Sequence, residues 1–416
     1  MMFQLKKYFA DEDINTGRQG EIDFLKAFLI IGMIFTHVYE DCFVTEGFVS
    51  QVICEYLCVI IGAASFMFCM GLGMQYSRRV NPKNLALRGL SLLGIGQLLN
   101  LGRNFLPNFI AYLVTGGKWF LGQQFLVLQA DILTFAGVTF FVMALLLHLK
   151  FTPGRILAVS AVLNIVCTIL CYTMPRPSGY LMQQNLAFFV ITDAECYFPF
   201  LAYFFFVAFG YYAGSWYRRI RDKDQVCSLI FRVVVPVCAV YYLIRFFVPI
   251  PILPEVSSDL QYILQPFPDA VATSFVSVIL LALLYKLEKH VFHGITPRAI
   301  TSISRNVNRY YCTSYMFILP LQTIFVAVFG GLPENEIAPF LVSVAITVLC
   351  VLVIGVYEKT LAGPVQHTKP VTKLCVYAAV WILTFLIVAY VYPKLDVFPN
   401  IWNNYLLDEV GKGGVL

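Results

Sequence analysis

Six acidic, basic or histidine residues lie in the first apolar stretch of the chain, EIDFLKAFLIIGMIFTHVYED, from Glu21 to Asp41. Lys26 and His37 lie eleven positions apart. At about 100° per residue, this spacing brings them to within roughly 20° of one helical face. Glu40 and Asp41 follow His37 by one helical turn, so either carboxylate can reach the imidazole. An imidazole oriented by a carboxylate has the parts of a general base, and the alternative is a buried histidine that only bonds to a neighbouring helix.

The stretch that carries these residues is expected to cross a membrane. Of the 416 residues, 59% are hydrophobic and 13% are charged, and the mean hydropathy is +0.75. These values exclude an ordinary soluble protein. An ionisable residue at membrane depth is costly unless it is paired or faces a cavity. We therefore expect His37 and its carboxylates to line a wet cavity that opens outward.

Apolar runs of bilayer-spanning length predict an all-α fold, a polytopic integral membrane bundle of about eleven transmembrane helices. Basic loops follow the even-numbered spans and acidic or neutral loops follow the others, which places the N-terminus inside and the C-terminus outside. Three outer segments, 104–129, 174–196 and 248–269, are too long for turns and are expected to cap the cavity. The predicted spans are 22–44, 50–76, 84–106, 128–149, 154–174, 196–216, 227–248, 268–288, 306–329, 337–357 and 372–392.

This topology predicts three regions: a cytoplasmic lead-in at 1–20, a single transmembrane domain at 21–392 and an outward-facing tail at 393–416. The net charge of +5 is what cytoplasmic loops of membrane proteins carry, so it does not indicate nucleic acid as a partner. The twelve cysteines are scattered through apolar runs without a metal-binding spacing, so no metal site is expected. Cys42 and Cys196, both expected near the outer face, could form a disulfide.

The opening stretch resembles the start of the acyltransferase type three family of membrane acyltransferases: an acidic residue, Asp23 and a basic residue precede an apolar helix that ends in histidine. That family has an Arg where this chain has Lys26, and Lys cannot reproduce a bidentate guanidinium contact. Later stretches resemble, in a consistent order, the same clan, which includes the lysosomal heparan-glucosaminide acetyltransferase group. They are ASFMFCMGLGM at Ala64–Met74, LALRGLSLLGIGQLLN at Leu85–Asn100, QADILTFAG at Gln129–Gly137, YFPFLAYFFFVAFGYYAG at Tyr197–Gly214 and ISRNVNRYYCTSYMFILPLQ at Ile303–Gln322.

The resemblance implies transfer of an acyl group, most often acetyl from acetyl-CoA, to a hydroxyl or amine of a sugar-containing acceptor. His37 would act as general base, or as a transient acyl carrier, with Asp41 and Glu40 beside it. Asn100 could orient the thioester carbonyl or only cross-link helices. The polyanionic donor would bind the basic residues of the inner side, namely Lys26, Arg78, Arg79, Lys83 and Arg88.

Four outer residues are candidates for acceptor binding. Asp131 could bind a sugar hydroxyl or accept the first amides of a helix. Trp119 could stack on a sugar or simply pack. Asp193 and Glu195 could contact the acceptor or only keep a loop solvated.

The competing function is a proton-coupled transporter or flippase of a glycan or lipid intermediate, in which Lys26, His37 and Asp41 would form the proton path. The chain shows no inverted repeat, which favours the enzyme. The expected partners are acyl-CoA, a free or lipid-linked sugar acceptor and membrane lipids, and the resemblance raises the option of a homodimer. The expected location is a bacterial cytoplasmic membrane.

Overall fold

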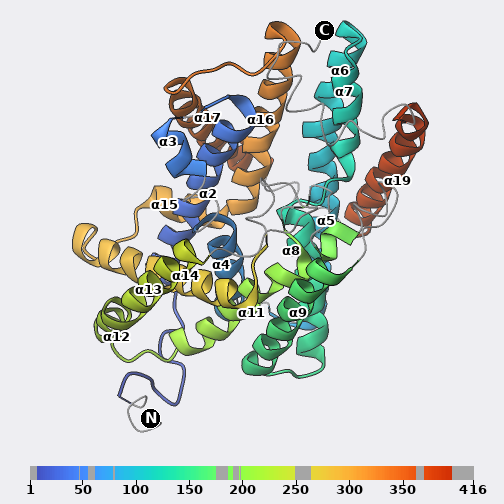
Figure 1. The fold of residues 1–416 in the computed structure, drawn as a ribbon. Helices are drawn as coiled ribbons and strands as arrows, with labels where there is room; N and C mark the ends of the chain where they lie inside the picture. The colour runs from blue at the N-terminus through green and yellow to red at the C-terminus, as the bar shows by residue number, and fades with distance from the viewer. Residues whose placement is uncertain are drawn as a thin grey trace. The chain divides into compact units, whose positions relative to one another are not determined.

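The computed structural model describes residues 7–45, 47–54, 61–77, 80–174, 186–190, 196, 198–248, 264–361 and 370–395. In this part of the chain the regular structure is helical, with two isolated β-bridges and no β-strand (Figure 1). Nine helical segments among the described residues are long and apolar enough to cross a membrane. The predicted fold class, an all-α polytopic membrane bundle, is confirmed, and the count of eleven spans stays a prediction.

The chain divides into two compact units. Helices α2 (Gly20–Cys42) and α5 (Pro82–Asn100) belong to both, because each begins in the first unit and ends in the second. The predicted single transmembrane domain, 21–392, stays a prediction. The predicted tail, 393–416, lies outside the described residues beyond Leu395.

The first unit contains the beginnings of α2 and α5 and the helical elements between Ala63 and Tyr76 and between Ile132 and Arg305. The first half of α2 packs here through Ile22, Leu25 and Leu29, which join one apolar cluster with residues of α4 and α14. The elements are α4 (Ala63–Tyr76), α8 (Ile132–His148), α9 (Pro153–Thr173), α11 (Phe200–Tyr217), α12 (Lys223–Leu229), η4 (Ile230–Val234), α13 (Val235–Phe247), α14 (Phe267–Val291) and α15 (Arg298–Arg305).

Helices α4 and α11 approach each other through two glycines. A β-carbon on Gly71 would lie 2.0 Å from the carbonyl oxygen of Val207, and one on Gly210 would lie 2.0 Å from that of Phe68. Small residues allow two helix backbones to approach closely, which is a common way of packing helices in membranes. The two aromatic, glycine-containing stretches of the sequence therefore form one interface.

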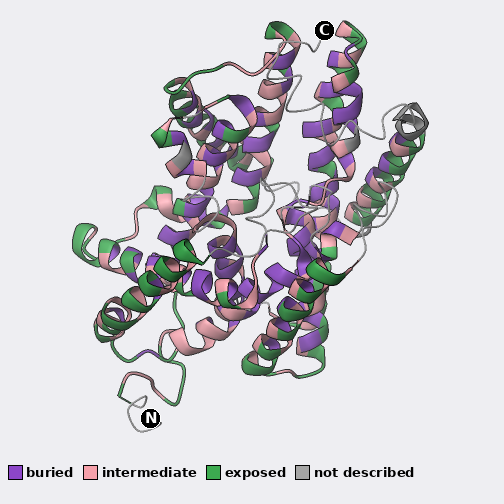
Figure 2. Ribbon diagram, viewed as in Figure 1, coloured by how far each residue is buried: buried purple, intermediate pink, exposed green. Residues whose placement is uncertain are grey.

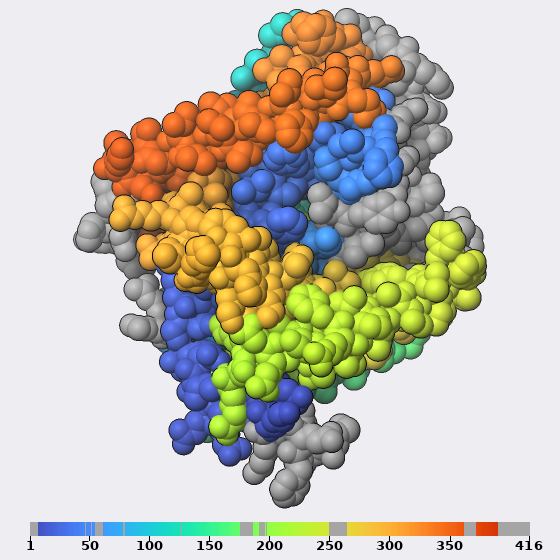
Figure 3. Space-filling view, turned by 90° about the vertical axis from the view of Figure 1, so that its left-hand side faces the viewer, coloured from blue at the N-terminus to red at the C-terminus, as the bar shows by residue number. Residues whose placement is uncertain are grey.

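The segment from α12 through η4 to α13 lies at the periphery of the first unit. Figure 3 shows it as a continuous yellow-green ridge at the surface. Only 11% of its most apolar stretch is buried, compared with 61% for α2. The exposed side chains include Val240, Leu243 and Phe247, and α13 is accordingly mostly green in Figure 2. A helix that is apolar on its exposed side is expected to face lipid.

The second unit contains the end of α2 with His37, the end of α5 and the C-terminal helices. A long helical column starts at Pro82 and ends at Thr115, where Gly116 adopts the left-handed conformation with φ +70°. The elements are α3 (Phe48–Gln51), η2 (Leu101–Phe105), α6 (Leu106–Thr115), α7 (Lys118–Gln123), η3 (Gln124–Leu128), α16 (Val307–Phe329), α17 (Ala338–Thr360) and α19 (Pro370–Leu395).

The segment 104–129, predicted to be an outer cap, is largely helical, and the helix of the third predicted span, 84–106, extends to Thr115. The helix continues through a π-helical turn, η2, and then through α6, after which the short helices α7 and η3 follow. Pro107 comes directly after the π-helical turn η2, and it removes one backbone N–H from the hydrogen-bond ladder without ending the helix. The other two predicted outer segments, 174–196 and 248–269, lie largely outside the described residues.

Candidate active site

His37 lies in the second half of α2 and faces two of its own helix's carboxylates. Its Nδ1 is 3.5 Å from Asp41 Oδ2 and 3.9 Å from Glu40 Oε2. The three side chains remain partly accessible, with 26% of His37, 29% of Asp41 and 38% of Glu40 exposed. The spacing of three and four residues on one helix is what brings them together. The structure thus assembles the three residues that the sequence proposed for catalysis.

The other ring nitrogen of His37 contacts a residue from a distant part of the chain. Tyr315 of α16 places its hydroxyl 2.8 Å from His37 Nε2, and the two ring centroids are 4.8 Å apart. Because carboxylates only accept hydrogen bonds, they favour the tautomer with the proton on Nδ1. In that tautomer, Nε2 accepts a hydrogen bond from the Tyr315 hydroxyl and is the basic atom of the site.

Tyr315 is itself held by two buried residues. The guanidinium carbon of Arg103 lies 4.4 Å from the Tyr315 ring centroid, in a cation–π contact, and Tyr311 packs edge-on at 5.0 Å. Arg103 donates from Nη2 and Nε to Asn100 Oδ1, at 2.9 and 3.2 Å. Sequence reasoning named neither tyrosine. The available signal was their separation by four residues in YYCTSY, which places both on one helical face.

Asn100 is part of a row of amide side chains that hold the turn η3. Its Nδ2 donates to the carbonyl oxygens of Gln129 and Val127, at 2.9 and 3.3 Å. Gln97 and Asn104 bond to neighbouring carbonyls of the same turn in the same way. These contacts show the cross-linking role that the sequence left open for Asn100. Its contact with an acyl donor stays a prediction.

The residues proposed for donor binding have separate surroundings. Lys26 belongs to the first unit, where its Nζ lies 3.6 Å from the position of a β-carbon on Gly73 of α4. Arg88 stacks on the Phe140 ring at 4.6 Å, and Lys83 is exposed. Among the described residues, no contact joins these three side chains. Arg78 and Arg79 lie outside the described part of the chain.

The Asp23 carboxylate, one helical turn before Lys26, bonds to other residues. It accepts from Arg18 Nε and from the Ser304 hydroxyl, each at 2.5 Å, and Asp23 is buried. These bonds anchor the N-terminus of α2 to the first unit. The carboxylate one turn before Lys26 therefore serves the start of the helix.

Of the proposed acceptor residues, Asp131 has a clear structural role. Its Oδ1 accepts from the backbone amides of Leu133 and Thr134, at 2.9 and 3.1 Å, so it caps the N-terminus of α8. Trp119 packs edge-on against Phe120, with ring centroids 5.1 Å apart. Asp193 and Glu195 lie outside the described residues. Acceptor binding by these four residues stays a prediction.

We expect Asp131→Ala to lower the free energy of unfolding by about 1 kcal/mol, because two helix amides lose their acceptor. Asp131→Asn keeps an oxygen that can cap the helix and should retain most of this stability. Thermal unfolding of the detergent-solubilised protein measures both effects. If the two variants unfold at the same temperature as the unaltered protein, the cap contributes nothing.

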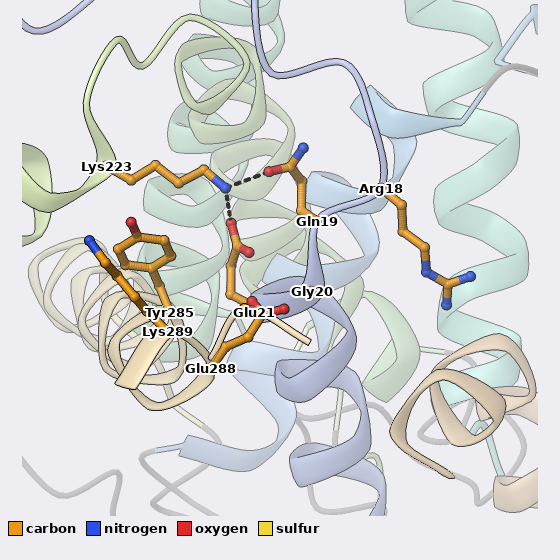
Figure 4. Close-up of a pocket in the computed structure, with 9 residues that line it drawn as sticks. Arg18, Gln19, Gly20, Glu21, Lys223, Tyr285, Glu288 and Lys289 are labelled. Atoms are coloured by element: carbon orange, nitrogen blue, oxygen red, sulfur yellow. Dashed lines mark hydrogen bonds and ion pairs between the residues drawn. The ribbon is translucent and has the colours of Figure 1, made fainter. Parts of the chain in front are cut away.

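A second polar cluster surrounds the start of α2, at a cavity of about 270 Å³ in the first unit (Figure 4). Lys223 donates to Gln19 Oε1 at 2.5 Å and pairs with the buried Glu21, which also accepts from the Tyr217 hydroxyl. Glu288 lines the same cavity and accepts from Thr296. The cluster joins helices about two hundred residues apart in sequence, so no local pattern could have indicated it. Lys223 neutralises the buried Glu21, and we assign the cluster a structural role.

Cys42 and Cys196 are both free thiols, and Cys42 Sγ bonds to the carbonyl oxygen of Ile318 at 3.4 Å. Among the described residues, no group of three or more His, Cys, Asp or Glu side chains is arranged to hold a metal ion.

Comparison with known families identifies the chain. Residues 18–241, more than half of the sequence, match the model of the heparan-alpha-glucosaminide N-acetyltransferase catalytic family. No curated protein and no solved structure matches the chain. The matched region includes His37, Asp41 and Arg103 and ends before Tyr315. The chain therefore belongs to the heparan-alpha-glucosaminide N-acetyltransferase catalytic family, whose members are membrane acetyltransferases that act on sugar acceptors.

Proposed function

We propose that this protein transfers an acetyl group from acetyl-CoA to a sugar acceptor within the membrane, with His37 as the general base. The observation that carries the proposal is the setting of His37. Its Nδ1 faces Asp41 and Glu40, and its Nε2 lies 2.8 Å from the Tyr315 hydroxyl. Membership of an acetyltransferase family supplies the reaction class, and the histidine supplies the group that a proton transfer needs.

The proposed reaction moves one proton and one acyl group. His37 Nε2 takes a proton from the acceptor as its nitrogen or oxygen attacks the thioester carbonyl. The carbon–sulfur bond then breaks, and the departing thiolate takes up the proton from His37. The carboxylates of Asp41 and Glu40 stabilise the imidazolium that forms in between. An acyl-histidine intermediate would use the same Nε2 as nucleophile, with the acceptor attacking in a second step.

We propose an amine of an amino sugar as the first acceptor to test, ahead of a hydroxyl. The name of the family specifies an N-acetyltransferase. In addition, Asp41 and Glu40 place two partly exposed carboxylates beside the base, which favours the approach of a protonated amine. The ammonium must first release one proton to solvent, because His37 Nε2 has to be unprotonated to take the second proton as the free amine attacks. A neutral hydroxyl would gain less from the same charges.

The donor side of the proposal rests on charge. The phosphates of acetyl-CoA need cations, and Lys26, Lys83 and Arg88 remain our candidates. Basic residues near helix ends also favour a multi-pass protein with its N-terminus on the cytoplasmic side of a bacterial membrane. Donor contact by each residue can be tested by measuring the acetyl-CoA KM of single alanine variants.

We expect the purified protein in nanodiscs to acetylate glucosamine with isotope-labelled acetyl-CoA as the donor, and to release free CoA in equal amount. Mass spectrometry of the sugar and a thiol assay measure the two products. Glucose is the matched acceptor that offers only hydroxyls, and acetylation of glucose instead would change the acceptor from amine to hydroxyl. If no acceptor consumes acetyl-CoA and proteoliposomes show proton-coupled sugar uptake, the protein is a transporter and the proposal fails.

A further inference from the structure

The Tyr315 hydroxyl contacts the nitrogen of His37 that the proposed reaction needs as its base. Its hydroxyl lies 2.8 Å from His37 Nε2, the only ring nitrogen that does not face the carboxylates. A histidine ring can turn by 180° about its last side-chain bond, which exchanges each nitrogen with a carbon. Carboxylates at Nδ1 and a hydroxyl at Nε2 together favour one of the two orientations.

The hydroxyl is placed by a series of buried contacts within the second unit. The carbonyl oxygens of Gln129 and Val127 hold Asn100, and Asn100 holds the guanidinium of Arg103. Arg103 is only 2% exposed and lies against the Tyr315 ring. A buried guanidinium that is hydrogen-bonded along one edge and lies against an aromatic ring has little freedom to move. These contacts therefore fix the position of the Tyr315 hydroxyl before any substrate binds.

The π-helical turn η2 contributes to this arrangement. Arg103 and Asn104 are the buried residues of that turn, and both direct polar groups inward. π-helical turns inside α-helices occur frequently at functional sites, because they present side chains that a regular helix would direct elsewhere. Here the turn supplies the residue that supports Tyr315.

We infer that Tyr315 is a positioning residue, which holds the His37 ring with Nε2 available and yields that nitrogen to the acceptor; Arg103 in turn holds Tyr315. This inference rests on the proposed function of His37 as the base. The acceptor N–H or O–H must replace the Tyr315 hydroxyl at Nε2, because one lone pair cannot accept two strong hydrogen bonds. The tyrosine therefore both aligns the base and competes with the acceptor.

The two effects predict a characteristic kinetic result for Tyr315→Phe. Loss of alignment should lower kcat by about ten- to a hundredfold. Loss of competition should lower the acceptor KM by about fivefold, the equivalent of one hydrogen bond. Arg103→Lys, which keeps the charge but loses the planar stacking, should lower kcat in the same direction. Damage to the fold alone would lower the active fraction without lowering KM.

Tyr310→Phe is the matched control, because Tyr310 lies on the same helix, is 3% exposed and has no part in the site. Its kcat and KM should equal those of the unaltered protein. If Tyr315→Phe retains full kcat while His37→Ala is inactive, the inference on Tyr315 is wrong and the proposed function stands. If the unaltered protein transfers no acetyl group, or if His37→Ala retains full activity, the proposed function itself fails. Thermal unfolding of each variant shows whether it is folded.

Discussion

His37→Ala should lower kcat for acetyl transfer by about 10²- to 10⁴-fold, the usual contribution of a positioned general base. If the histidine also carries the acyl group, the loss should lie at the upper end of this range or beyond it. The side chain is partly exposed and makes its polar contacts with Asp41, Glu40 and Tyr315, so its removal leaves no large cavity. The acetyl-CoA KM should therefore change little. Steady-state transfer of labelled acetyl to glucosamine measures both constants.

His148→Ala is the matched control for this change. His148 lies in the last turn of α8 in the first unit, where we assign it no catalytic part. Its removal should leave kcat unchanged. Asp41→Asn provides a second comparison, because an amide oxygen can still accept from Nδ1 but cannot stabilise the imidazolium by charge. It should lower kcat by about a hundredfold. Full activity of His37→Ala would exclude the histidine as base and as acyl carrier.

Gly71→Ala and Gly210→Ala should each prevent normal folding of the first unit. The added β-carbon would lie 2.0 Å from a backbone carbonyl oxygen of the facing helix, and a backbone cannot move aside as a flexible side chain can. Helices α4 and α11 would have to separate along an interface that carries much of the core. We expect a loss of about 3 kcal/mol or more, a large share of the stability of an ordinary protein.

Gly355→Ala on α17 is the matched control, since nothing lies within 4 Å of the β-carbon that it would add. Fluorescence-detected size-exclusion chromatography should show a monodisperse control, with aggregated or unexpressed variants at Gly71 and Gly210. Thermal unfolding of any material that remains soluble measures the loss of stability. A Gly71→Ala protein that unfolds at the temperature of the control would contradict the close approach of α4 and α11.

The parts of the site that sequence could predict are the local ones. Helical spacing places Asp41 and Glu40 one turn after His37, and the structure has this geometry because it depends only on α2 being a helix. Several helix limits were predictable for the same reason: α9, Pro153–Thr173, is displaced by one residue from the predicted span 154–174. Long apolar runs determine their own secondary structure.

The parts that sequence could not predict depend on tertiary contacts. Tyr315 meets His37 across 278 positions of sequence, and nothing in the spacing of either segment indicates that pairing. Asp23 precedes Lys26 by three positions, a spacing that would allow an ion pair on a helix, yet its carboxylate bonds to Arg18 and Ser304. In the sequence, the two glycine-containing aromatic stretches stand out only by their resemblance to the family. The structure supplies the physical reason for their glycines, which is contact between two backbones.

The number of residues in the π-helical turn Leu101–Phe105 helps to determine the geometry of the site. A π-helical turn accommodates one residue more than an α-helical turn. Deleting one residue beside Arg103 would let this turn close as an ordinary α-helical turn. Because the wider turn absorbs the extra residue, the helix beyond it would keep nearly the same phase, and Asn108 could still bond to Thr323. The side chains of the turn itself would change direction, so Arg103 would lose its place on the Tyr315 ring. Such a deletion would remove the support of Tyr315 while it leaves the rest of the helix in place and removes no catalytic group.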